Sequence, residues 1–209
     1  MSASLLKEHL NLRADVVPLN VDQYHQMIAK GILAEGEPIE LLDGFLIRKD
    51  RSKKGADPMT VGHHHAWAVA QLMQTFFPFT ASHGCHIRIQ QPVTIPPDHE
   101  PEPDAVIARN DASDFKHGHP RAEDIFCIVE VADSSLQRDR TTKHRIYAEA
   151  NIAQYVIVNL VDGVVEEYRD PAAETGAYLS SRSYRKGDTI PFAVGGGRLV
   201  SVPAADLLP

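Results

Sequence analysis

The sequence predicts a mixed α/β (α+β) fold, in which helices flank one mixed β-sheet and additional β-hairpins extend it. Three observations support this class. Strand-like apolar runs alternate with a few helical patterns along the chain. The pairs Asp43-Gly44 and Asp162-Gly163 each lie between apolar strands, a strong short-range signal for a hairpin. Residues 125–132 form an apolar run of the kind found in central, buried strands.

The size and composition of the chain fit one folded domain. It has 209 residues, 43% of them hydrophobic and 23% charged, which allows a sizeable core and argues against disorder. We expect residues 1–18 to form a leader and residues 19–209 a single domain. The net charge of −7 argues against a protein that coats nucleic acid by bulk attraction, although residues 48–54 and 138–145 form local basic patches.

The cysteines and the apolar segments indicate the cellular setting. Cys85 and Cys127 are far apart in sequence and lack the spacing of a zinc site. No apolar stretch has the length of a membrane span, and the N-terminus has no apolar core typical of a signal peptide. We therefore expect a reduced, cytoplasmic protein with no membrane partner.

Two helices are predicted in the N-terminal half. A short amphipathic helix follows Asn20, its expected N-cap, and ends near Gly31. The segment TVGHHHAWAVAQLMQTFF is expected to be a second helix that places Met73 and Phe76 on one apolar face and ends at Pro78.

Strands are predicted through the rest of the chain. CHIRIQQPVTIP alternates as a strand, and DAVIAR is a second, shorter one. YVIVNL and VVEEYRD are expected to pair through the turn at Asp162-Gly163. AYLSSRSYRKGDTIPF is expected to give a further strand pair, and GGGRLV a turn before a strand and a C-terminal tail.

Glu130 is the residue that first points to chemistry. It lies near the end of the strand predicted over 125–132, where it is expected to share a face with Phe126 and Ile128. A buried lone carboxylate costs free energy unless it is paired, hydrogen-bonded or bound to a metal. A salt bridge to a lysine or arginine is the simpler interpretation. A second acid, Asp104, at the start of another strand favours a pair of carboxylates holding Mg²⁺.

A helix predicted over residues 136–150 supplies a cation. Ser135 is a plausible N-cap, and Asn151 suits the left-handed position after the last turn. Asp139 and Lys143 lie four residues apart, on one side of this helix. Asp139 either orients Lys143 or forms with it an ordinary solvated pair worth about 0.3–0.5 kcal/mol.

Packing this helix on the sheet would bring Lys143 to Glu130. There the lysine would polarise or deprotonate a water for attack on phosphorus, with the metal stabilising the developing charge. Glu40, at the start of the first hairpin, is a third acid that is either a surface strand-end carboxylate or a further metal ligand.

The run from His63 to His65 is a weak metal signal. Consecutive helical residues point in different directions, so the three imidazoles are a poor ligand set for one ion. A capping or solvated position is the simpler interpretation of this run.

These segments together resemble the PD-(D/E)XK nuclease superfamily. Within it the chain is most similar to the large bacterial, Uma-type family of restriction-endonuclease-like proteins once catalogued as a domain of unknown function. The similarity runs from residue 19 to the C-terminus through IELLDGFLI, GHHHAWAVAQL, EPDAVIAR and IVEVADSSLQRDRTTKHRIYAEANIAQYVIVN. Residues 130–155 are its most specific part.

The resemblance implies a restriction-endonuclease-like fold and a Mg²⁺- or Mn²⁺-dependent endonuclease acting on nucleic acid, expected to be DNA. A homodimer is expected by analogy. The metal-binding residues it implies are Asp104 and Glu130. The catalytic residues it implies are Asp104, Glu130, Lys143 and Glu40. The residues expected to bind substrate are His65 and Asp139, and a satisfied structural position is an equally simple interpretation of His65.

Several positions depart from the family pattern. Ala132 stands where the superfamily usually has its lysine, which Lys143 on the next helix replaces. Asp133 stands where serine is common and adds negative charge near the expected metal, while Asn151 replaces a usual glycine and Val156 a usual tryptophan. Two other functions remain open: a non-catalytic module that binds nucleic acid or protein on the same fold, and a histidine-based metal hydrolase.

Overall fold

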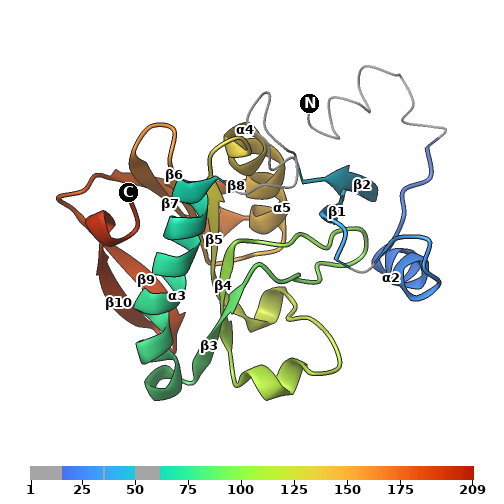
Figure 1. The fold of residues 1–209 in the computed structure, drawn as a ribbon, viewed down its shortest axis with the longest axis horizontal. Coiled ribbons are helices and arrows are strands. Elements are labelled where there is room, and N and C mark those ends of the chain that lie inside the picture. Colours follow the sequence, from blue (N-terminus) through green and yellow to red (C-terminus); the bar gives the residue numbers. More distant parts are fainter. Residues whose placement is uncertain (1–15, 35, 50–61) are drawn as a thin grey trace.

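A six-stranded sheet forms the centre of the molecule (Figure 1). The computed structural model describes residues 16–34, 36–49 and 62–209. The strands follow the order β3-β4-β5-β6-β7-β8, with β5 and β6 parallel and every other neighbouring pair antiparallel. They are β3 (Cys85–Ile89), β4 (Ala105–Arg109), β5 (Ile125–Ala132), β6 (Gln154–Asn159), β7 (Val164–Ala172) and β8 (Ala177–Tyr184). The predicted mixed α/β class is confirmed.

Two apolar layers cover the faces of this sheet. On one face, α3 (His63–His83) and the hairpin of β9 (Thr189–Gly195) and β10 (Arg198–Pro203) pack against buried valines of β5. On the other face, α5 (His144–Glu149) packs through Ile146 and Tyr147 onto Ile128 and Ile157. Each such fully buried aliphatic side chain contributes about 1.5–3 kcal/mol. The predicted strand over 125–132 is therefore central and buried on both faces.

A β-bulge changes which side chains of β5 share a face. The register shifts between Ile107 and Ala108 of the neighbouring β4. As a result Phe126 packs on the α3 side, whereas Ile128 lies in the α5 layer. The prediction that Phe126 and Glu130 share a face was wrong, because it assumed unbroken alternation.

Helix α3 is longer than predicted. It runs through Pro78 to His83 and ends at Gly84, which has the left-handed φ of 64°. The predicted end at Pro78 was wrong: proline weakens a helix interior, but apolar side chains both before and after it pack on the sheet. Phe76 is buried as predicted, whereas Met73 is 50% exposed because the buried stripe is too narrow to include it.

The C-terminal strands pair differently from the prediction. AYLSSRSYRKGDTIPF contributes β8 and β9, but these strands do not pair with each other: β8 pairs with β7, and β9 with β10. The reason is burial. Ile190, Phe192 and Val194 of β9 enter the α3 layer, whereas most of β8 is exposed. The predicted strand after the glycine-rich turn is β10.

The N-terminal elements follow their local signals. Asn20 caps α2 (Val21–Ala29) through a capping box with Gln23, as predicted from its position. The predicted hairpin consists of β1 (Ile39–Leu42) and β2 (Phe45–Arg48), and its turn residues Asp43 and Gly44 both have positive φ. Short 3-10 turns occur at Ala112–Phe115 (η1), Ala122–Asp124 (η2) and Ala204–Asp206 (η4).

Two predictions concern residues outside the described ranges. They are most of the expected leader, residues 1–15, and most of the first basic patch, residues 50–54. Across the described ranges, no helix combines the length and the apolar character needed to cross a membrane.

Candidate active site

Lys143 lies between two buried carboxylates at the end of β5. Its Nζ is 2.8 Å from Oε1 of Glu130 and 2.8 Å from Oε1 of Glu40. The same Glu130 oxygen accepts a hydrogen bond of 2.9 Å from the Tyr147 hydroxyl. The predicted approach of Lys143 to Glu130 is therefore present, and Glu40 joins it from the first hairpin.

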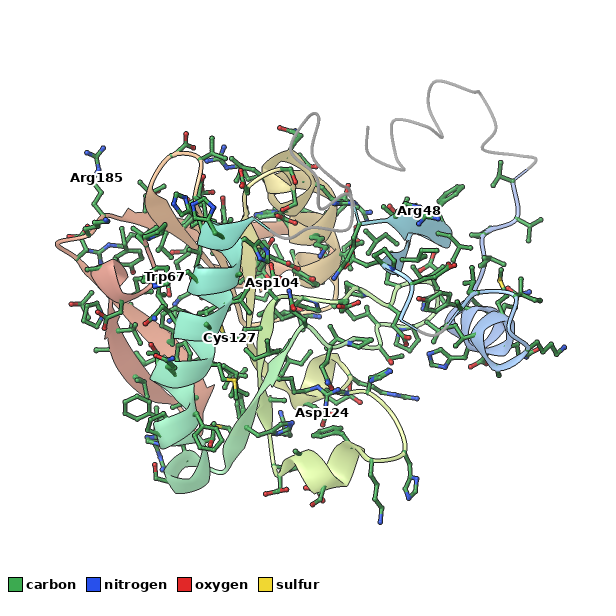
Figure 2. The ribbon with its side chains drawn as sticks, in the orientation of Figure 1. Arg48, Trp67, Asp104, Asp124, Cys127 and Arg185 are labelled. Carbon is green, nitrogen blue, oxygen red and sulfur yellow. The ribbon has the colours of Figure 1, made fainter. Side chains whose placement is uncertain are left out.

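Asp104 is fixed beside Glu130 by a backbone hydrogen bond. Its Oδ2 accepts the Val131 N–H at 2.9 Å and lies 3.2 Å from Nε2 of His65. Its Oδ1 accepts a hydrogen bond of 3.2 Å from Nε2 of Gln90. Figure 2 shows Asp104 beside α3, near the middle of the molecule. The two acids predicted to bind metal thus come from adjacent strand ends.

Glu40 is held by the β1–β2 hairpin and a second lysine. Its Oε1 accepts the Glu102 N–H at 2.8 Å, and Nζ of Lys49 lies 3.9 Å from that oxygen. Lys49 also donates to the Glu102 carbonyl at 2.7 Å and lies 3.3 Å from its carboxylate. These contacts tie the hairpin to the segment that precedes Asp104.

The predicted helix over 136–150 is present but not uniform. It consists of α4 (Leu136–Arg138), a π-helical segment η3 (Asp139–Lys143) and α5. Single π-helical turns often occur at functional sites. Asp139 accepts a 2.6 Å hydrogen bond from the Ser135 hydroxyl, and among the ion pairs of the described residues it forms none with Lys143. Ser135 occupies the N-cap position without a side-chain cap bond, and Asn151 has the expected left-handed φ of 56°.

Burial and charge move the pKa values of the two central acids apart. Burial raises the pKa of Glu130 to about 8, and the negative charges of Asp139 and Asp104 add to this effect against the opposing charge of Lys143. Burial also disfavours the charge of Asp104, but the hydrogen bond and charge of His65 outweigh it and hold its pKa at about 2. One acid is therefore firmly ionised and the other is poised to exchange a proton.

The flanking charges remain in their ionised forms. Burial lowers the pKa of Lys143, but the charges of Glu130, Glu40 and Asp139 outweigh this and raise it above its ordinary value. Burial raises the pKa of Glu40, but Lys143 and Lys49 together bring it below its ordinary value. Lys143 is accordingly an ammonium group in this arrangement.

The site carries more negative than positive formal charge. Four acids converge with two ammonium groups, so full ionisation would leave an excess of two negative charges: Glu40, Asp104, Glu130 and Asp139 against Lys49 and Lys143. Oε2 of Glu40 and Oδ1 of Asp139 are buried without any hydrogen-bond partner. Buried carboxylate oxygens normally have partners, so the cluster has unused capacity for a cation.

The donor set suits a hard divalent cation. No three His, Cys, Asp or Glu side chains in the described part of the chain converge as ligands of one ion. Mg²⁺ usually takes only one or two protein carboxylates, together with waters and substrate phosphates. The paired acids Asp104 and Glu130 fit that requirement.

Contrary to the prediction, the three consecutive histidines do not all point apart, because two of their rings lie together. His65, in the first turn of α3, contacts Asp104, whereas the rings of His63 and His64 lie against each other with centroids 4.1 Å apart. Nδ1 of His65 is buried without a hydrogen-bond partner.

Two site residues were not predicted from the sequence: Lys49 and Gln90. Tyr147, by contrast, lies four residues after Lys143, a spacing that places it on the same helix side. Gln90 has a φ of 49°, and Lys49 follows the end of a strand, so neither has a local pattern that places it at the site.

The second basic patch, residues 138–145, is partly neutralised by acids of the same chain. Arg145 donates to Asp43 at 2.7 Å and to Glu149 at 2.6 Å, which links α5 to the first hairpin. Arg138 has no ion pair among the described residues, and its Nε is buried without a hydrogen-bond partner. Of the two arginines, Arg138 is therefore the one whose guanidinium is available to contact a ligand.

Comparisons with known proteins agree on the family and the fold. The model of the Uma2 family, described as "Putative restriction endonuclease", matches residues 21–196. No curated protein matches the chain. A solved structure that it resembles is that of "a putative nuclease belonging to DUF820" from Anabaena variabilis, with a TM-score of 0.63 and 15% identity, covering 91% of this chain and 97% of the other. At that identity the likeness shows the fold alone. Because the family model spans most of the chain, including Glu40, Asp104, Glu130 and Lys143, the chain belongs to the Uma2 family, and the predicted resemblance to restriction-endonuclease-like proteins is confirmed.

Proposed function

We propose that this protein is a metal-dependent endonuclease that hydrolyses phosphodiester bonds in nucleic acid, with DNA as the expected substrate. The observation that supports this most directly is the cluster of buried acids around Lys143 at the end of β5. A structural salt bridge needs one acid for each base. This cluster has two acids in excess and two unpartnered carboxylate oxygens.

Asp104 and Glu130 would hold Mg²⁺ or Mn²⁺, with Glu40 as an outer acid. A divalent cation bound there would stabilise negative charge on the phosphate and lower the pKa of a water. Asp104 is ionised throughout the physiological range because its pKa is about 2. Glu130, with a pKa of about 8, releases its proton as the cation binds.

Lys143 would act as a cation rather than as a base in this arrangement. Its raised pKa keeps the ammonium group protonated, so it donates hydrogen bonds to a water or a phosphate oxygen. Glu130 and Glu40, if they held a cation, would bind Lys143 Nζ, now 2.8 Å from each, less strongly. The lysine would then be available to the reacting phosphate.

Substrate positioning would come from residues next to the acids. His65 contacts Asp104, and Arg138 carries a guanidinium without an ion pair in the described ranges. Asp139, itself one of the clustered acids, would contribute through its carboxyl group. We include in the proposal a single working domain over residues 19–209, a cytoplasmic location, and a homodimer by analogy with nucleases of this fold.

The test is cleavage of supercoiled plasmid and of labelled single-stranded DNA in Mg²⁺ or Mn²⁺ against EDTA. Glu130→Gln and Asp104→Asn preserve shape, and Arg185→Ala changes an exposed residue that projects from the far end of the molecule (Figure 2). We expect metal-dependent cleavage by the wild type and Arg185→Ala, and loss of about 100-fold or more in the two acid variants. No cleavage by the wild type, or equal cleavage by Glu130→Gln, would refute the proposal.

One observation favours a second function. Lys143 already pairs with both Glu130 and Glu40 without a metal, as it would in a non-catalytic binding module whose polar network only holds the fold. That function predicts nucleic-acid binding without cleavage and no stabilisation by divalent cations.

A further inference from the structure

Strand β3 presents a row of nitrogen-bearing side chains that leads to the acid cluster. The isoleucines of β3 pack on the α3 side of the sheet, so the alternating residues His86 and Arg88 face the other side. Gln90 follows the end of β3 with a left-handed φ of 49°, and its Nε2 donates to Asp104 at 3.2 Å. Because β3 is an edge strand next to β4 (Figure 1), the row lies along one border of the sheet.

Arg88 carries a charge without a neutralising acid. It forms no ion pair with any described residue, and its Nε is buried without a hydrogen-bond partner. Burial alone acts on its guanidinium and lowers the pKa. Arg140 and Arg145, in contrast, each contact two carboxylates. A partly buried cation without a partner costs free energy, which points to an anion as its missing partner.

His86 has the same kind of unused nitrogen. Its Nδ1 is 3.1 Å from the Asn110 carbonyl, and its Nε2 is buried without a partner. The Phe115 ring supports both side chains: its centroid is 5.4 Å from that of the His86 ring and 5.9 Å from the guanidinium carbon of Arg88. One aromatic side chain therefore holds two unpartnered nitrogen groups in place.

We propose that Arg88, supported by His86, binds a backbone phosphate of the nucleic-acid strand next to the phosphate held at Asp104 and Glu130. Alternate residues of a strand are about 6.6 Å apart, so an extended phosphate backbone laid along β3 would meet His86 and Arg88 in turn. Beyond the end of the strand it would reach Gln90, which contacts Asp104. The proposal rests on the nuclease function and adds to it the path of the substrate. Such contacts position a strand without reading its sequence.

The test is binding of fluorescein-labelled single-stranded and duplex oligonucleotides, measured by anisotropy in EDTA and in Ca²⁺ over a series of salt concentrations. Arg88→Met removes the charge and keeps much of the volume. Arg182→Met is the matched control, because Arg182 also lies on an edge strand and over an aromatic ring, with its guanidinium carbon 5.0 Å from the Tyr184 centroid. Thermal unfolding of each variant is followed in parallel.

We expect Arg88→Met to weaken binding about tenfold or more and to reduce the salt slope by about one. Its melting temperature should equal or exceed that of the wild type, because a partly buried guanidinium without an ion pair has been removed. Arg88→Lys should keep the wild-type dependence of affinity on salt concentration and part of the affinity itself. Arg182→Met should match the wild type in both the affinity and its salt dependence.

The outcomes separate this inference from the nuclease proposal. A wild type that binds and cleaves DNA while Arg88→Met binds equally well would overturn the role of Arg88 alone. A lower melting temperature of Arg88→Met with unchanged salt slope would assign Arg88 to the fold instead. A wild type that binds no nucleic acid under any of these conditions overturns both proposals.

Discussion

At the scale of single residues, the site is a set of competing electrostatic effects around one lysine. Lys143 is buried at a cost in solvation and is retained because Glu130 and Glu40 each lie 2.8 Å from its Nζ. Burial raises the pKa of Glu130, and the charge of Lys143 does not offset burial together with the repulsion from the neighbouring acids. This distribution of charge leads to a prediction about pH.

Glu130→Gln should flatten the dependence of stability on pH in the absence of metal. The folded pKa of Glu130 is about 8, above the unfolded value of about 4.3, so the folded state binds more protons between these values. The free energy of unfolding of the wild type therefore falls as pH rises from about 5 to 8, by up to about 1.4 kcal/mol per pH unit from this group.

Urea unfolding at several pH values in EDTA measures this effect. Asp104→Asn serves as the comparison, because the lowered pKa of Asp104 places its own contribution at acidic pH, where stability is lost as pH falls from about 4 to 2. Identical slopes for the wild type and Glu130→Gln between pH 5 and 8 would contradict the raised pKa of Glu130.

At the scale of elements, short turns and hairpins determine where the acids lie. The β1–β2 hairpin carries Glu40 to Lys143, and its turn packs closely on the segment before α2: a Cβ at Gly44 would lie 2.9 Å from the Leu19 carbonyl oxygen and closer still to Pro18. Gly44 also has a φ of 72°, a conformation that L side chains rarely adopt.

Gly44→Ala should destabilise the protein more than Gly163→Ala and should also reduce nuclease activity. Gly163, in the β6–β7 turn, has a similar φ of 64° but open space around it, so alanine there adds only backbone strain of about 1 kcal/mol. At Gly44 the clash adds to this strain and displaces the hairpin that holds Glu40. Chemical denaturation and plasmid nicking test both variants, and equal losses in the two would refute the link between the turn and the site.

The elements that were predicted correctly have signals within a few neighbouring residues. Asp43-Gly44 indicates its hairpin, and the apolar run of β5 indicates a central strand wherever its partners lie. Pro78 and Phe126 were misplaced because burial against distant segments overrides their local signals. The pairing of β8 was likewise decided by which strand could bury its side chains in the α3 layer.

The candidate site likewise contains residues that could be predicted from the sequence and residues that could not. Glu130 and Lys143 could be predicted because strand and helix periods place them, and the family resemblance indicates Asp104 and Glu40. Lys49 could not be predicted, since it reaches the acids only after the hairpin has folded against the segment before Asp104.

At the scale of the whole molecule, the site lies where the sheet, α3, the helical segment after β5 and the first hairpin all meet. Its residues come from positions 40 to 147 of the chain, so these four parts of the fold must be in place before the acids converge. The repulsion between these acids opposes folding, and a bound divalent cation would remove it. Metal binding and folding stability should therefore be linked.

Millimolar Mg²⁺ or Mn²⁺ should raise the melting temperature of the wild type relative to EDTA. A ligand at about 100 times its Kd stabilises the folded state by about 2.7 kcal/mol. Asp104→Asn should lose this response, whereas Asp206→Asn, which changes an exposed acid, should keep it. Lys143→Met should show a larger metal response than the wild type from a lower starting stability, because it leaves two buried carboxylates without their ammonium partner.

Differential scanning fluorimetry at constant ionic strength measures these shifts, with Na⁺ replacing the divalent cation in the control. We expect the cation to raise the melting temperature of Lys143→Met the most. It should raise those of the wild type and Asp206→Asn by a smaller, equal amount, and that of Asp104→Asn hardly at all. If all four proteins shift equally, the cation acts on the overall charge of −7 rather than on the acid cluster. If the melting temperature rises only in the proteins that keep Asp104, the ion binds at the acid cluster. The stability of the fold then depends on the same cation that the proposed reaction needs.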